Sequence, residues 1–248
     1  MEITSVNNDL VKETVKLQQK KYRDKENKFI LEGLKCVEEA VNSGIEPEYI
    51  FVLKEKKENY KHLCKNLILT NEVVLKKIST TDSAPDIVAV AQKKVFSVSD
   101  IKTSKKLVLL ENIKDLGNLG TILRTSVAFG ADGIILFGSE CADIYNPKCV
   151  RSSVGNLWKI PVVYISDLNE LRENFKDFEK VATLPRAKSY LKDFRVSLPV
   201  MVMFGSEADG LSDELIKLST SQVKIEMREN VESLNLSVSC AVVLYSIL

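Results

Sequence analysis

The sequence predicts an α/β protein, with a parallel sheet in its C-terminal part and a smaller α/β domain before it. The first observation is a pair of short, unbroken apolar runs, residues 107–110 and 134–137, which are typical of strands buried on both faces. The second is the helical spacing of Leu119, Ile122 and Val127 between these runs, which makes the stretch a βαβ unit with parallel strands. The third is that strand and helix patterns keep alternating along the rest of the chain.

The loop between the first strand and this helix, residues 111–118, is rich in polar side chains: Glu111, Asn112, Asp115 and Asn118. Ligands of open parallel sheets bind beyond the carboxyl ends of the strands, so this loop is where we expect chemistry. Asparagine is favoured at helix N-termini, and we expect Asn118 to cap the helix.

The helix contains one residue that can reach the loop, Arg124. It lies four residues after Gly120 on the same face, and its side chain should point back toward the helix N-terminus. A solvated helix arginine is the alternative that this motif alone leaves open. We expect the helix to end at Gly130.

Two later stretches repeat the pattern of a strand followed by polar residues. Residues 200–204 predict a buried strand, Glu207 lies just past its end, and Ser212 is expected to cap a short helix. Further on, a strand at 223–227 leads into a loop, after which Ser233 and Asn235 open a final helix.

Together the three stretches resemble, in order, the three motifs of the SpoU (TrmH) family of RNA ribose 2′-O-methyltransferases, members of the knotted SPOUT superfamily. The motifs read ENIKDLGNLGTILRTSVAFGADGI, FGSEADGLS and IEMRENVESLNLSVS. The resemblance covers residues 107–248 and implies a SPOUT methyltransferase domain with a deep trefoil knot and S-adenosyl-L-methionine as the cofactor. The chain departs from the family's pattern at Leu116 and Glu226, where many relatives have proline. Glu226 leaves the detail of the cofactor-binding turn open.

The resemblance also implies roles for individual residues. The family's proposed catalytic base is Arg124, assisted by a substrate phosphate, although a guanidinium is normally always protonated. We therefore expect Arg124 to act first as a phosphate clamp that orients the 2′-hydroxyl, with Glu207 as the alternative base. Asn118, Ser233 and Asn235 would hold the arginine, the ribose and the loops by hydrogen bonds. The residues implied to form the cofactor pocket, largely through backbone groups, are Thr183, Leu184, Gly205, Ser206, Ile225, Met227, Ser233, Leu234, Asn235 and Leu236.

The N-terminal part predicts a substrate-binding domain of its own at residues 1–95, followed by a linker at 96–106. Residues 6–41 resemble the N-terminal domain attached to many SpoU-type enzymes. The expected strands lie at 29–31, 49–53, 67–69 and 87–91, and the expected helices at 8–18, 34–44, 54–65 and 72–78.

A basic run in this domain can meet the phosphates of RNA. Residues 12–28 hold seven basic and three acidic side chains. A solvated helix end and loop is the alternative. The residues that we expect to contact RNA are Lys12, Lys20, Lys21, Arg23, Lys28 and Arg124.

The final helix is apolar all round, which predicts burial on more than one side. One apolar stripe contains Val238 and Tyr245, and the other contains Val243 and Ile247. A single sheet face covers only one stripe, so the other needs a second surface. The resemblance favours a homodimer through the C-terminal domain, with Val243 and Ile247 at the contact, although the knotted chain could also supply that surface.

The composition counts against several classes of protein. The five cysteines show no CxxC spacing and the only histidine is His62, so we expect no disulfide framework, no metal site and no histidine-based catalysis. No apolar run approaches a membrane span and no signal-peptide pattern is present, so we expect a soluble, cytoplasmic protein.

Ribosomal RNA is the expected substrate, with transfer RNA as the alternative. Two further classes of protein stay open: a noncatalytic RNA-binding protein that kept the fold, and a transferase that acts on a small molecule. The lysine-rich N-terminal domain counts against the small-molecule transferase.

Overall fold

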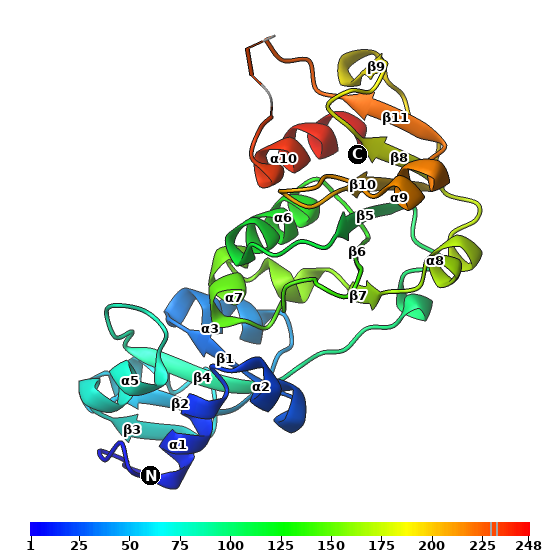
Figure 1. The fold of residues 1–248 in the computed structure, drawn as a ribbon. Coiled ribbons are helices and arrows are strands. Elements are labelled where there is room, and N and C mark those ends of the chain that lie inside the picture. The colour runs from blue at the N-terminus through cyan, green and yellow to red at the C-terminus, as the bar shows by residue number, and fades with distance from the viewer. Residues whose placement is uncertain (229, 232) are drawn as a thin grey trace. The chain divides into compact units, whose positions relative to one another are not determined.

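Figure 1 shows the computed structural model, which describes all residues of the chain apart from 229 and 232. The chain divides into two compact units. The N-terminal unit comprises Met1–Lys94 and Asp143–Lys159, and the C-terminal unit comprises Val95–Ala142 and Ile160–Leu248. The segment Asp143–Lys159, which we expected within the methyltransferase domain, therefore packs with the N-terminal unit.

The N-terminal unit contains a four-stranded mixed sheet. Its strands are β1 (Lys28–Glu32), β2 (Pro47–Leu53), β3 (Leu67–Thr70) and β4 (Ile87–Gln92). The strand order is β1-β4-β2-β3, in which β4 runs antiparallel to β1 and β2, and β2 runs parallel to β3. All four expected strands are confirmed.

Several helices of this unit pack apolar residues on the sheet, whereas others bury few side chains or none. The helices are α1 (Asp9–Lys16), α2 (Lys20–Glu26), α3 (Leu34–Asn42), η1 (Lys54–Lys56), α4 (Lys57–Tyr60), α5 (Glu72–Ile78), α7 (Pro147–Ser153) and η3 (Asn156–Lys159). Val11 of α1 and Leu75 of α5 are fully buried in one cluster with Phe51 of β2. One expectation was wrong in detail: the stretch 54–65 forms only the short helices η1 and α4. The basic run contains helix α2, which was not predicted.

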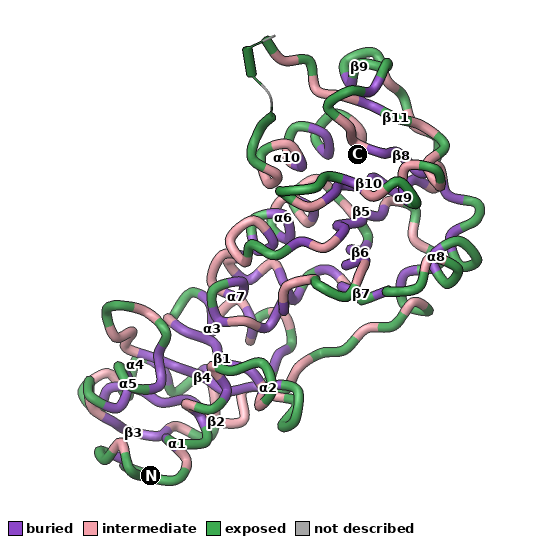
Figure 2. The backbone as a smooth tube through the Cα atoms, in the orientation of Figure 1, coloured by how far each residue is buried: buried purple, intermediate pink, exposed green. Residues whose placement is uncertain are grey.

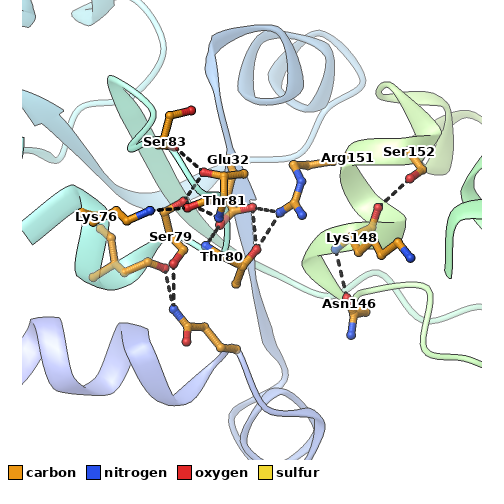
Figure 3. Close-up of polar contacts among 12 residues, drawn as sticks. Glu32, Lys76, Ser79, Thr80, Thr81, Ser83, Asn146, Lys148, Arg151 and Ser152 are labelled. Atoms are coloured by element: carbon orange, nitrogen blue, oxygen red, sulfur yellow. Dashed lines mark hydrogen bonds and ion pairs between the residues drawn. The ribbon is translucent and has the colours of Figure 1, made fainter.

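Helix α7 contacts β1, and a polar network joins the two elements (Figure 3). The buried carboxylate of Glu32 accepts hydrogen bonds from the backbone N–H of Thr80 at 2.5 Å and from its hydroxyl at 3.0 Å. Arg151 of α7 donates to the same carboxylate and, at 2.6 Å, to Thr80 Oγ1. The rings of Phe29 and Tyr145 pack with centroids 4.9 Å apart. These contacts explain why a segment distant in sequence belongs to this unit.

The C-terminal unit contains a seven-stranded parallel sheet. Its strands are β5 (Lys106–Glu111), β6 (Gly133–Phe137), β7 (Val162–Ile165), β8 (Glu179–Thr183), β9 (Ser189–Tyr190), β10 (Val200–Phe204) and β11 (Ser221–Lys224). The order is β7-β6-β5-β10-β8-β11-β9, and every pair is parallel. The predicted parallel α/β fold is confirmed. The last strand, expected at 223–227, ends earlier than predicted.

Helices cover both faces of this sheet. They are η2 (Val98–Asp100), α6 (Leu116–Ala128), α8 (Leu168–Asn174), η4 (Leu191–Asp193), α9 (Asp213–Leu218) and α10 (Leu236–Ile247). Leu171 of α8 and Leu215 of α9 share a buried cluster with Leu109 of β5. Val108, which points to the opposite face, is also fully buried. On that face α6 and α10 lie side by side and α10 contacts β10 (Figure 1). Figure 2 shows the resulting buried strands.

The start of α6 differs from the prediction. Asp115, not Asn118, is its N-cap, because the Asp115 carboxylate accepts a hydrogen bond from the backbone N–H of Asn118 at 2.7 Å. Gly130 follows the helix with a φ of 76°, as expected for a residue that ends a helix. Within the part of the chain that the structure describes, no helix has the length and apolarity needed to cross a membrane.

Candidate active site

The expected cofactor residues gather at one edge of the C-terminal sheet. Thr183 is the last residue of β8, Gly205 directly follows β10, and Ile225 directly follows β11. These three strands are neighbours in the order β10-β8-β11, and because they are parallel their carboxyl ends meet at one edge. Thr183, Leu184, Ser206, Ile225, Met227 and Leu236 are half-buried, Gly205 is buried, and Ser233, Leu234 and Asn235 are exposed.

This edge fits a cofactor that is read by backbone groups. The segments after the three strands contain small or apolar residues, whose backbone groups can bond an adenine or ribose without a charged side chain. The N–H groups of Leu184 and Ser206 are already bonded, to the carbonyls of Val223 and Gly210. The side chain of Thr183 is committed to the fold, since its hydroxyl donates to the carbonyl of Met203 at 2.8 Å. Backbone groups of this kind suit the adenosine part of S-adenosylmethionine, which is uncharged because the positive charge of the cofactor lies on its sulfur.

Side chains from all three motifs form one hydrogen-bonded chain. The amide nitrogen of Asn118 donates to Glu207 Oε1 at 2.9 Å, and the amide nitrogen of Asn235 donates to Asn118 Oδ1 at 3.1 Å. Asn235 is also the N-cap of α10, where its Oδ1 accepts from the N–H of Ser237 at 2.9 Å. The structure thus brings together three of the five predicted catalytic residues.

The loop after β10 holds Glu207 at its tip. Ser206 and Gly210 exchange two backbone hydrogen bonds of 3.1 Å, which close a tight hairpin around residues 207–209. A Cβ atom on Gly205 would lie 1.8 Å from the carbonyl carbon of Gly210, so only glycine allows this close approach. Glu207 is consequently exposed at the carboxyl edge of the sheet.

Arg124 and Ser233 lie apart from this hydrogen-bonded chain. Both residues are exposed, and in the described part of the site no hydrogen bond joins either to Asn118, Glu207 or Asn235. Arg124 lies on α6, between one and two turns beyond Asn118. An exposed guanidinium in this place is accessible to a phosphate of a bound nucleic acid.

Two residues of the first loop have structural roles that the sequence did not reveal. The buried carboxylate of Glu111 accepts the backbone N–H of Ser212 at 2.7 Å, which joins the first motif to the second. Asn112 has a φ of 47°, and a Cβ on Gly138 would lie 2.2 Å from its side-chain oxygen. The role of Glu111 had one sign in the sequence: it is an acidic residue directly after an apolar run.

Glu226, which stands where many relatives have proline, pairs with another side chain in the structure. Glu226 accepts a hydrogen bond from Lys192 of η4 at 2.5 Å, and this bond raises the pKa of Lys192. The pair links the segment after β11 to the segment after β9. Both side chains are exposed, so the pair is weak and does little to fix this turn.

The residues expected to bind RNA divide into two groups. Arg23 is buried: its guanidinium donates to Asp143 at 2.9 and 2.6 Å and to the carbonyls of Leu17 and Gln18 at 2.9 Å. The expectation that Arg23 contacts RNA is therefore wrong, because its donors are already used inside the N-terminal unit.

The basic side chains around Arg23 are more accessible. Lys20 and Lys21 are exposed on α2, and the Lys21 ammonium lies 4.7 Å from the ring centroid of Tyr22. Lys12 is exposed and 3.6 Å from Asp9, and Lys28 is half-buried and paired with Glu48 at 2.6 Å. Lys20 and Lys21 thus stay predicted RNA contacts, with both side chains exposed.

Comparison with known proteins finds family models that match both parts of the chain. The family model for the SpoU rRNA Methylase family matches residues 105–245, more than half of the chain. The model for the MRM3-like substrate binding domain matches residues 8–89. An uncharacterized tRNA/rRNA methyltransferase of Synechocystis is 34% identical over 98% of this chain and 92% of its own length. The 23S rRNA (guanosine(2553)-2′-O)-methyltransferase RlmP of Bacillus subtilis is 29% identical over 98% of both chains.

Solved structures agree over nearly the whole chain. An AdoMet-bound rRNA methyltransferase from Sinorhizobium meliloti is 28% identical, with a TM-score of 0.90 over 99% of this chain and 96% of that one. A structure described as an RNA 2′-O ribose methyltransferase is 30% identical, with a TM-score of 0.83 over 99% and 97%. With its three motifs joined at one edge of the sheet, this chain belongs to the SpoU rRNA methylase family.

Proposed function

We propose that the protein transfers the methyl group of S-adenosylmethionine to a ribose 2′-hydroxyl of ribosomal RNA. The observation that carries this proposal is the hydrogen-bonded chain Glu207–Asn118–Asn235, which joins all three motifs beside the strand ends that suit the cofactor. When bound, S-adenosylmethionine supplies an electrophilic methyl group on a positively charged sulfur. The protein must then place a ribose oxygen and accept its proton.

Different side chains place the ribose oxygen and accept its proton. Arg124, exposed on α6, binds a phosphate of the substrate and so orients the neighbouring 2′-hydroxyl. Glu207, held by Asn118, faces solvent at the same edge and accepts the proton of the 2′-hydroxyl, because a guanidinium that clamps a phosphate has no free site for a proton. Asn118 and Asn235 fix these loops, and Ser233, two residues before the N-cap of α10, adds a hydroxyl donor to the ribose side.

Ribosomal RNA is favoured over transfer RNA by the relatives. RlmP of Bacillus subtilis and a 31% identical protein of Streptomyces laurentii are both named as 23S rRNA 2′-O-methyltransferases. The Synechocystis relative carries a tRNA/rRNA name, so transfer RNA is the second candidate. We assign RNA binding by the N-terminal unit to the exposed lysines Lys20 and Lys21.

We also infer a knotted subunit and a homodimer through the C-terminal unit. Strand β10 lies between β5 and β8, both of which precede it in the sequence, an order that suits a knotted chain. On α10, Val238 and Tyr245 are 48% and 76% exposed, whereas Val243 is 2% exposed. The stripe of Val238 and Tyr245 is therefore the dimer surface that we propose. The expectation that Val243 contacts a second subunit is corrected, because that side chain is packed within one subunit.

A reducing, cytoplasmic setting is part of the same proposal. All five cysteines of the chain are free thiols. Burial raises the pKa of Cys36 to about 12, so this thiol stays protonated and unreactive. Cysteines of this kind suit a compartment that keeps thiols reduced.

The test is a methyl-transfer assay on defined RNA. Purified protein with S-adenosylmethionine labelled on its methyl group is incubated with unmodified ribosomal RNA or with transfer RNA, and the nucleosides are separated by mass spectrometry. The proposal expects labelled 2′-O-methylnucleosides from ribosomal RNA. Cofactor binding by calorimetry without transfer to either RNA would support a noncatalytic protein, and label on a base instead of ribose would contradict the reaction.

A further inference from the structure

A basic surface on the C-terminal unit has no role in the proposed reaction. It centres on Tyr190 in the two-residue strand β9, which is 39% exposed. The ammonium groups of Lys192 and Lys224 lie 5.3 and 4.6 Å from the centroid of its ring. Arg186 and Lys188 precede it on the same loop and are exposed. These five residues are called the β9 patch.

The β9 patch is basic within an acidic part of the chain. Residues 107–248 hold 15 Lys and Arg against 18 Asp and Glu, a net charge of −3. Within them, residues 185–195 hold four basic side chains and one acidic, a net charge of +3. The other residues of 107–248 therefore hold 11 basic and 17 acidic side chains, a net charge of −6. An anionic partner would be attracted to this loop rather than to the rest of this part of the chain.

The patch borders the proposed cofactor site. Tyr190 pairs in register with Lys224, and β9 runs parallel to β11, so both strands end at the carboxyl edge of the sheet. Lys192 donates to Glu226 at 2.5 Å, and Glu226 lies between the expected cofactor residues Ile225 and Met227. A nucleotide on the patch would therefore lie beside the reacting one.

Protection of a sheet edge is the competing explanation. β9 is an edge strand, and lysines on edge strands keep copies of a protein from pairing. Edge protection explains the basic charge of the patch, but it does not explain the exposed ring of Tyr190 at its centre. An exposed ring flanked by ammonium groups is instead the arrangement on which single-stranded nucleic acids bind, with the base stacked and the phosphates neutralised.

We propose that the β9 patch binds a single-stranded segment of the RNA substrate next to the methylated nucleotide. A base stacks on Tyr190. Lys224 moves from the ring to a flanking phosphate, and Lys192 leaves both the ring and Glu226 to reach another. This inference rests on the proposed function. It adds a substrate contact on the unit that holds the cofactor, in addition to the N-terminal lysines.

The test compares full-length variants for RNA affinity, methyl transfer and cofactor binding. Tyr190→Ala should weaken RNA binding about tenfold and raise KM for RNA, whereas Tyr190→Phe, which keeps the ring, should stay within about twofold of wild type. Lys192→Ala/Lys224→Ala should lower the log–log slope of RNA affinity against salt by about 1.4, or roughly 0.7 for each lost phosphate contact. Tyr190→Ala should leave the Kd for S-adenosylmethionine unchanged.

Lys102→Ala/Lys176→Ala is the matched control. Both lysines are exposed on the same unit but precede β5 and β8, at the opposite edge of the sheet. Unchanged affinity and salt slope in both patch variants, with an active wild type, would overturn the patch while leaving the proposed function intact. Self-association of the lysine variant with unchanged RNA affinity would support edge protection instead. A wild type that transfers no methyl group would overturn both proposals.

Discussion

The buried carboxylate of Glu111 and the backbone N–H of Ser212 are joined by a 2.7 Å hydrogen bond. Glu111 ends β5, and Ser212 caps the helix that follows the Glu207 loop. The bond between Asn118 and Glu207 joins the same two segments at their exposed ends. Two cross-links therefore hold the loop that carries Glu207, one buried and one at the site.

The buried cross-link predicts that Glu111 positions Glu207. Glu111→Ala should lower kcat about tenfold, because the Ser212 N–H loses its partner and the loop loosens. Glu111→Gln should stay within about threefold, since an amide oxygen still accepts the bond. In a Glu207→Ala background, Glu111→Ala should have little further effect on kcat, because coupled residues are not additive. Equal losses in both backgrounds would show that Glu111 acts independently of Glu207.

Arg124→Ala should reduce methyl transfer by at least about a hundredfold while leaving the Kd for S-adenosylmethionine within about twofold. The reason is that the exposed guanidinium is assigned to the RNA side of the site. Single-turnover transfer and cofactor calorimetry measure the two effects separately. Arg124→Lys keeps a charge but not the bidentate geometry and should recover only part of the rate. Activity within a few-fold of wild type in Arg124→Ala would contradict this assignment.

Arg23→Ala should destabilise the protein by about 3–5 kcal/mol, because it leaves the buried carboxylate of Asp143 without its cation. Urea unfolding followed by circular dichroism measures this change. Lys20→Ala, on the exposed face of the same helix, is the control and should change stability by less than about 0.5 kcal/mol. RNA affinity should respond in the opposite way: Lys20→Ala should weaken RNA binding more than Arg23→Ala does. Loss of RNA binding without loss of stability in Arg23→Ala would restore Arg23 as an RNA contact.

The two stripes of α10 should respond differently to charge. Val238→Asp places a carboxylate on the exposed stripe and should give a folded monomer, whereas Val243→Asp buries it and should unfold the C-terminal unit. Light scattering reports the mass and thermal unfolding reports the stability. A wild type that is monomeric at micromolar concentration would rule out the proposed dimer.

The sequence predicted the strands well because apolar runs such as residues 200–204 form the centre of a sheet buried on both faces. It misplaced the cap of α6, because Asp115 and Asn118 are both good capping residues. The assignment matters for function: with Asp115 as the cap, the Asn118 side chain is available to bond Glu207.

Contacts between segments that are distant in sequence could not be predicted from the sequence pattern. Arg23 looked like one more exposed cation because its partner, Asp143, lies 120 residues away. The segment Asp143–Lys159 follows C-terminal strands in the sequence, but contacts such as those of α7 with β1 place it in the N-terminal unit. Likewise, the pattern of α10 gave two apolar stripes without saying which one the sheet covers. A fragment that starts near residue 105 would keep Asp143–Lys159 without the rest of the N-terminal unit. RNA binding is therefore better tested with full-length variants.

The most direct test maps ribose methylation in RNA from cells that have the protein, lack it, or carry only the Arg124→Ala variant. Mass spectrometry of ribosomal and transfer RNA fragments locates each 2′-O-methylnucleotide. We predict at least one ribosomal RNA position that is methylated in wild-type cells and unmethylated in the other two. Identical methylation in all three would contradict the claim that this protein is an RNA 2′-O-methyltransferase.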